Sequence, residues 1–266
     1  SSAIRQLEDQ LGVQLVFRGS RFQGLTPEGE RVLGWARRLV GDARAMRAEM
    51  RTVREGLSGT LRLGVIPTAL PMVARLTTPF AQRHPNVRLT VLSRTSAEIL
   101  AGIERLELDA GLTYLDNEPL GRVVQVPLYA EFYRLLCAPG LAFADRDQVT
   151  WGELAGLPLC LLTADMQNRR IVAQHLAEAG VAVAPQVESN STIALIAHVM
   201  TGRWASVLPK SLADLLATAG TLRAIPIVAP EAEHLVGLIA AHREPHTPLI
   251  EALLEAGRRM AGTASR

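Results

Sequence analysis

The sequence has little of what marks a disulfide-stabilised, metal-binding or membrane-spanning protein. Only 4% of its 266 residues are aromatic, and it has two cysteines, Cys137 and Cys160. Two cysteines provide neither a disulfide framework nor a metal-ligand cluster, so we expect no metal and no cofactor. No apolar run reaches membrane-spanning length, and no signal peptide opens the chain. These absences favour a cytoplasmic protein without a membrane partner.

Motifs of known enzyme classes are also missing. The sequence contains no G-x-S-x-G elbow, no P-loop and no metal-ligand spacing, and its six histidines are scattered. We therefore predict no catalytic residues and no enzyme activity. Both cysteines lie in apolar, strand-like runs, which is typical of inert buried thiols. A thiol-based redox sensor stays open as an alternative.

What is present is an ordinary globular composition with an uneven charge. The chain is 48% apolar and 20% charged, with a net charge of +2, and its length allows one or two domains. Residues 1–59 hold ten arginines and seven acidic residues, whereas residues 60–266 hold eighteen basic and nineteen acidic residues. The basic excess of the first part points to an anionic partner there.

A long amphipathic helix is predicted from Pro27 to Leu57. Its apolar residues recur at alternating steps of four and three, as in a heptad seam, at positions Val32, Ala36, Leu39, Ala43, Met46, Met50, Val53 and Leu57. Proline at the first position suits the start, and Gly56 suits the stop. So narrow a seam needs a partner helix. We predict dimerisation through residues 27–57, with a core helix of the following domain as the alternative.

The residues before this helix predict a second, shorter helix and a basic hairpin. Ile4, Leu7 and Leu11 lie on one helical face, and Gly12 ends the helix. An apolar run follows, and then the glycine-bearing basic segment 18–24. A helix followed by a basic hairpin is how a winged helix-turn-helix ends.

The remainder of the chain alternates between strand and helix patterns. The predicted strands are 60–66, 87–92, 108–112, runs within 123–138, 157–162, 186–188, 205–208, 222–227 and 234–241. The predicted helices are 72–83, 96–106, 151–154, 167–179, 191–201 and 248–261. The strand–helix alternation over residues 60–112 predicts a mostly parallel sheet with covering helices, and the whole order predicts an α/β fold of two lobes.

Hydroxyl- and amide-rich loops follow four of these strands. Ligands of open α/β sheets bind beyond the carboxyl ends of strands, near helix N-termini. We therefore predict a site for a small polar molecule formed by Thr68, Ala69, Thr95, Ser96, Thr163, Met166, Asn168, Ser191 and Thr192. Helix capping is the alternative role for Ser96 and Ser191. Of Arg169 and Arg170, we expect one to face an anionic ligand and the other to lie in solvent or in a salt bridge.

The segments SxAIRQLEDQLGVQLVFR…LTPEGE, GTLRLGVIPT, FAQRHPNVRLTVL, LDAGLT and MTGRWASVLP resemble LysR-type transcriptional regulators over the whole chain. Trp204 departs from the family, which often has glycine there. The resemblance implies a partial winged helix-turn-helix at 1–26, whose two preceding helices lie outside this sequence, and a linker helix at 27–58. It also implies an effector-binding domain at 59–266 with the fold of periplasmic binding proteins. Lobe one would be 60–131 plus 233–262, and lobe two 132–232.

The resemblance further implies which residues meet DNA and what controls the protein. Ser1, Ser2 and Arg5 would lie in the recognition helix, and Arg18 and Arg21 in the wing would contact phosphates. Double-stranded promoter DNA, a small anionic effector between the lobes, and further copies of the chain up to a tetramer would be the partners. A binding protein of the same fold without DNA binding is the remaining alternative.

Overall fold

The computed structural model describes residues 2–19, 22–182 and 184–264, and begins with a small helical module. Helix α1 (Ser2–Leu11) is followed by an antiparallel bridge between Val16 and Leu25. The carboxylate of Glu8 accepts hydrogen bonds from the Leu15 N–H, at 2.7 Å, and from the Val16 N–H, at 3.3 Å. One buried side chain thus ties α1 to the segment that follows. Two residues predicted to meet DNA, Ser1 and Arg21, lie outside the described residues.

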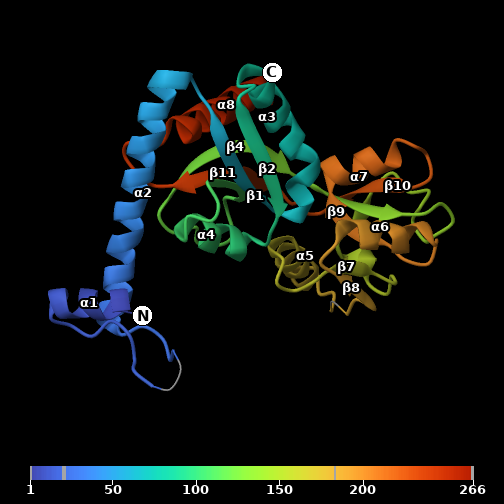
Figure 1. Ribbon diagram of the computed structural model, residues 1–266. Coiled ribbons are helices and arrows are strands. Elements are labelled where there is room, and N and C mark those ends of the chain that lie inside the picture. The colour runs from blue at the N-terminus through green and yellow to red at the C-terminus, as the bar shows by residue number, and fades with distance from the viewer. Residues whose placement is uncertain (1, 20–21, 183, 265–266) are drawn as a thin grey trace.

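Helix α2 (Pro27–Glu55) is capped at both ends, as its sequence predicts. The Thr26 hydroxyl accepts from the Gly29 N–H at 3.0 Å, and the Gly56 N–H donates to the Thr52 carbonyl. Figure 1 shows α2 at one side of the molecule, with α1 at one end and the α/β part beside it. Capping at both ends fixes the helix over the length of the heptad seam.

The two faces of α2 meet different surroundings. One face packs on the α/β part: Gly41 is buried against Arg243, and Arg37 forms a 2.9 Å ion pair with Glu104. The heptad seam lies elsewhere on the helix and is largely uncovered; its larger exposed side chains are Leu39 (67%), Met46 (60%), Met50 (56%) and Val53 (79%). A contiguous exposed apolar surface of this kind marks an interaction face.

Lobe one is a five-stranded sheet in the order β2-β1-β3-β11-β4. Its strands are β1 (Gly59–Val65), β2 (Val87–Ser93), β3 (Ala110–Tyr114), β4 (Val123–Glu131) and β11 (His234–Ala241). Strands β1, β2 and β3 are parallel, whereas β11 runs antiparallel to β3 and β4. The helical segments η1 (Pro67–Ala69), α3 (Leu70–Arg83), α4 (Ser96–Glu104) and α8 (Pro248–Ala264) complete this lobe.

Lobe two lies on the other side of lobe one from α2 (Figure 1). Its sheet has the order β6-β10-β5-β9, formed by β5 (Tyr133–Cys137), β6 (Val149–Thr150), β9 (Ser206–Pro209) and β10 (Arg223–Val228). A parallel pair joins β7 (Cys160–Leu162) to β8 (Val187–Ser189). The helical segments are η2 (Gly152–Leu154), α5 (Gln167–Glu178), α6 (Thr192–Met200) and α7 (Lys210–Ala217). The chain passes between the lobes at residues 131–133 and 228–234.

The predicted α/β fold with two lobes is confirmed, with three local corrections. Helix α7 was not predicted, because its eight residues are too few for a clear apolar period. Strand β7 begins at Cys160 rather than at residue 157, since Pro158 has no N–H to donate. Strand β3 begins at Ala110 because the Asp109 carboxylate accepts the Arg62 N–H at 2.8 Å. The domain limits predicted from the sequence stay a prediction.

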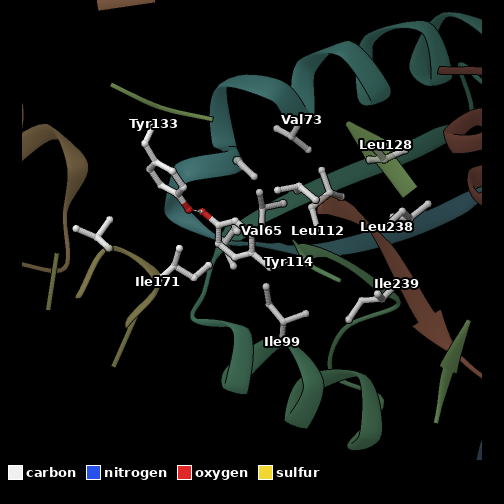
Figure 2. Packing of buried hydrophobic residues seen from close by; sticks show 14 of the residues in the cluster. Val65, Val73, Ile99, Leu112, Tyr114, Leu128, Tyr133, Ile171, Leu238 and Ile239 are labelled. Atoms are coloured by element: carbon white, nitrogen blue, oxygen red, sulfur yellow. Dashed lines mark hydrogen bonds between the residues drawn. The ribbon is translucent and has the colours of Figure 1, made fainter. Parts of the chain in front are cut away.

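One of two apolar clusters extends through both lobes. It includes Leu112 and Ile99 of lobe one together with Ile171 of α5, which is fully buried. Figure 2 shows Ile171 beside Tyr114 and Tyr133, whose hydroxyl groups point toward one another. Helix α5 is therefore packed against lobe one as well as against its own lobe.

The exposed seam of α2 predicts dimerisation through this helix. Replacing Leu39 and Met46 together by Glu places charges where a partner helix would cover them, and should give monomers in sedimentation. Arg51→Glu is the matched control, because Arg51 is exposed and lies off the seam; it should leave the oligomer intact. Intact oligomers in the double variant would contradict the prediction.

Candidate functional site

A small cavity lies between the lobes, where the carboxyl ends of strands from both meet. Lobe one contributes residues that follow β1 and β2, and Tyr114 at the end of β3. Lobe two contributes the end of β7 and the start of α5. The lining residues are Ile66, Pro67, Thr68, Thr95, Ser96, Tyr114, Leu162, Met166, Gln167 and Asn168. The cavity is small. The volume open to the centre of a water molecule is ≈ 10 Å³, so there is room for about one water molecule.

Two hydroxyl groups in the wall of this cavity have no hydrogen-bond partner. Thr68 is 1% exposed and Ser96 is 3% exposed, and neither hydroxyl oxygen has a partner among the described residues. Buried polar groups are normally paired, and leaving one unpaired costs about 1–3 kcal/mol. An occupant that bonds to these hydroxyls would remove this cost.

The neighbouring hydroxyl of Thr95 has a different role. Thr95 is the N-cap of α4: its hydroxyl accepts from the Glu98 N–H at 3.1 Å, and the Glu98 carboxylate accepts from the Thr95 N–H at 2.8 Å. This reciprocal capping box leaves Ser96 free to face the cavity. Capping, considered for Ser96 from the sequence, is thus the role of Thr95.

Helix α5 presents an uncapped N-terminus to the cavity. Its N-cap, Met166, provides no side-chain acceptor, so the N–H groups of the first turn are available to an anion. The Gln167 side chain donates to the Asp116 carbonyl at 3.3 Å, which leaves its own oxygen unpartnered. Asn168 donates to the Tyr114 hydroxyl at 3.1 Å. The lobe-two wall therefore offers N–H donors and one free acceptor.

The structure brings together part of the predicted residue set. Thr68, Thr95, Ser96, Met166 and Asn168 line the cavity. Ala69 is buried next to Thr68 but does not line it, and neither do Thr163, Ser191 and Thr192. Ser191 caps α6, accepting from the Ala194 N–H at 3.4 Å. The loop after β8 is thus not part of this cavity.

Two polar lining residues were not predicted, although the sequence contains a signal for each. Tyr114 ends β3, so the rule that places ligands beyond strand ends applies to it as well. Gln167 lies in one of the loops identified from the sequence, and opens α5.

Neither of the two arginines at the start of α5 lines the cavity, so the expectation that one faces a ligand there is wrong for this arrangement. Arg170 pairs with Glu118 of lobe one through two contacts, at 2.7 and 2.9 Å. Arg169 turns toward Glu188 on β8, at 3.7 Å, and burial lowers its pKa.

A buried polar network extends from the cavity to the first crossover between the lobes. The Tyr114 hydroxyl donates to the Glu131 carboxylate and lies 3.4 Å from the Tyr133 hydroxyl. Burial raises the pKa of Glu131 to about 8, against the opposing effect of the Tyr114 hydrogen bond. Glu131 is thus mostly neutral at neutral pH. Uncharged groups therefore connect the wall of the cavity to the first crossover between the lobes.

Both cysteines are shielded from solvent. Cys137 and Cys160 are each 0% exposed and belong to two different apolar clusters. Burial raises the pKa of both thiols, that of Cys160 to about 11. Reactive cysteines are accessible and have lowered pKa values, so these two have the character of structural residues.

The N-terminal module keeps several predicted DNA-contact residues at the surface. Ser2 and Arg5 of α1 are exposed. The Arg18 guanidinium lies 2.8 Å from the Glu8 carboxylate, and the Leu15 N–H is the main cause that lowers the pKa of Glu8. Glu8 therefore holds α1 to the segment that follows it. Arg18 is 60% exposed and can still reach a phosphate while it is paired.

Comparison with known proteins assigns the chain to a family. Residues 54–262 match the family model described as the LysR substrate binding domain. The chain belongs to the LysR family of transcriptional regulators. Among the described residues, no group of three or more histidine, cysteine or acidic side chains could hold a metal ion. No helix in this part of the chain is long and apolar enough to cross a membrane.

Several similar proteins are described as hydrogen peroxide-inducible genes activators or as OxyR. A probable hydrogen peroxide-inducible genes activator of Mycobacterium avium is 31% identical over 241 residues, which are 90% of this chain and 77% of that protein. The DNA-binding transcriptional dual regulator OxyR of Escherichia coli is 27% identical over 98% of this chain and 86% of its own. A full-length OxyR variant of Pseudomonas aeruginosa superposes with a TM-score of 0.76 at 25% identity, over 97% of this chain and 84% of its own.

The different roles of Thr68 and Thr95 predict opposite effects on stability. Thr68→Val removes an unpaired buried hydroxyl, so the free energy of unfolding without ligand should stay the same or rise, by up to about 1–3 kcal/mol. Thr95→Val removes an N-cap bond and should lower it by about 0.5–2 kcal/mol. Urea unfolding measures both. A clear loss of stability in Thr68→Val would show that its hydroxyl is paired in solution.

Proposed function

We propose that this LysR-type transcriptional regulator is controlled by a small anionic metabolite bound between its two lobes. The observation that carries the proposal is the pair of unpartnered hydroxyls, Thr68 and Ser96, facing the uncapped N-terminus of α5. An anionic group suits the first-turn N–H groups. The free oxygen of Gln167 accepts from a hydroxyl or amino group on the same molecule. A hydroxycarboxylate has both chemistries.

The cavity walls come from both lobes, and this suggests how such a ligand would act. With room for about one water molecule, the closed arrangement must open to admit a metabolite and then close around it in a new relative orientation. Lobe one also packs on α2 through Gly41 and Arg243. A change in the angle between the lobes would therefore be passed to the linker helix, and a change in its position would move the DNA-binding modules.

Dimerisation and DNA binding belong to the same proposal. The exposed seam of α2 would join two copies, and family-like tetramers would pair these dimers. Ser2 and Arg5 on α1, together with Ser1, would contact bases, and Arg18 and Arg21 would contact phosphates of promoter DNA. The N-terminal module also argues against a solute-binding protein of the same fold that does not bind DNA, because such a protein needs neither α1 nor the seam.

Peroxide sensing through a thiol is the second candidate, because of the relatives' names. It requires an accessible thiolate, and neither cysteine of this chain meets that condition in the structure. We predict that Cys137 and Cys160 remain unreactive toward a thiol-specific disulfide reagent in the native protein, and react fully only after denaturation. Fast reaction of either thiol in the native protein, or a disulfide formed after peroxide treatment, would favour the redox sensor.

The effector proposal is tested by thermal shift against a panel of small carboxylates, hydroxycarboxylates and phosphate esters. A compound that binds the folded protein raises its melting temperature. Ser96→Ala should then weaken the binding of a compound so found by roughly ten- to hundredfold, since a hydrogen bond to a charged group contributes about 1.5–3 kcal/mol. Thr192→Val, at the start of α6 and outside the cavity, is the control and should bind as the parent does. Equal affinity in all three proteins would contradict the proposal.

A further inference from the structure

Two histidines meet across the interface between the lobes. His175 of α5 and His234, the first residue of β11, approach through their Nε2 atoms at 3.0 Å. Their side chains are 13% and 14% exposed. An Nε2 atom carries either a proton or a lone pair, so this contact is a hydrogen bond only while one of the two atoms is unprotonated. Two fully protonated rings would direct two N–H groups and two positive charges at each other.

Each ring has one carboxylate on its other side. The Nδ1 atom of His234 is 3.4 Å from Asp116, whose carboxylate already accepts the Leu235 N–H at 3.0 Å. The Nδ1 atom of His175 is 3.5 Å from Glu178, a 55% exposed residue of the same helix. A positive charge on His234 therefore faces a carboxylate held in place by the backbone, whereas the carboxylate beside His175 is largely in water.

The other groups that face the pair are uncharged at neutral pH. Trp151 stacks on His175 with ring centroids 5.0 Å apart. Tyr114 and Tyr133 present ring edges to His234 at 6.3 and 6.1 Å. Glu131 lies opposite His234 in the strand register, and its raised pKa keeps it mostly neutral. Few surrounding groups can therefore compensate a second proton on the pair.

We propose that His175 and His234 form an acid-sensitive latch, which holds α5 on lobe one while one ring is neutral and releases it when both are protonated. The contact needs no effector, so it goes beyond the proposed function and can be tested separately. Helix α5 also carries Gln167 and Asn168, so its release would withdraw the lobe-two wall from the cavity. A fall in pH would thus change the same angle between the lobes that the effector is proposed to control.

The direction of the pH effect follows from the histidine in α5. Burial, and then the proximity of His234, lower the pKa of His175 below its ordinary value of 6.5. An opened or unfolded chain therefore binds more protons than the latched one as the pH falls below 6.5. The latched arrangement is accordingly fully stable above that pH and loses stability below it.

Trp151 offers a direct optical test of protonation, because a charged imidazole quenches the fluorescence of a stacked indole. In a Trp35→Phe, Trp204→Phe background, emission should fall as the pH is lowered from about 8 to about 5. His234→Asn should move the midpoint upward, because the proximity of His234 is one of the causes that lower the pKa of His175. His175→Gln should abolish the transition. His198→Asn is the control, since the His198 ring bonds within its own helix to the Ala194 carbonyl, and it should change nothing.

Opening is measured as the distance between spin labels on the two lobes, at the exposed positions Arg88→Cys and Ala197→Cys. The buried native thiols stay unlabelled. The distance should lengthen between about pH 8 and about pH 5 in the parent and in His198→Asn, and stay constant in His175→Gln. A constant distance in the parent would overturn the latch. So would an equal lengthening in His175→Gln, or an unshifted fluorescence midpoint in His234→Asn.

Discussion

The docking of α5 against the strand ends of lobe one is the constraint on which the arrangement of the molecule depends. Ile171 places an apolar anchor in the shared core, and Asn168 and Arg170 reach Tyr114 and Glu118 across the interface. These contacts surround a cavity in whose wall two hydroxyls, those of Thr68 and Ser96, are left unpaired. The lobes are thus held together by paired groups in and beside the cavity wall, while the Thr68 and Ser96 hydroxyls are free for a ligand. Such a division would let a small molecule change the angle between the lobes without taking apart either lobe.

The two sides of the linker helix α2 also have different contacts. Its seam residues, such as Leu39 and Met46, are uncovered, whereas Gly41 admits the Arg243 side chain so closely that an added Cβ would lie 1.2 Å from it. One side of α2 is therefore available to a second copy while the other follows lobe one. This arrangement gives a physical connection between an event at the lobe interface and the relative position of two DNA-binding modules.

Much of this organisation could be predicted from the sequence, because periodicity and strand ends are local signals. The seam of α2, the α/β alternation and the loops after β1, β2 and β7 are all local patterns. The side-chain roles could not be predicted, because they depend on contacts between segments far apart. Thr95 and Ser96 look alike in the sequence, yet one caps α4 and the other faces the cavity. Arg170 forms an ion pair with Glu118, 52 positions earlier, and the pairing of His175 with His234 spans 59 positions. Neither pairing can be predicted from local sequence patterns, because each depends on how the two lobes pack together.

The central claim is that the effector lies between the lobes at the start of α5. Hydrogen exchange followed by mass spectrometry, with and without a compound identified by thermal shift, tests it most directly. We expect slower exchange of the backbone amides of residues 167–169 and of the segment 68–69 when the compound is bound, because these amides become bonded or are shut off from water. Protection confined to other segments, such as residues 37–41 of α2, would contradict it.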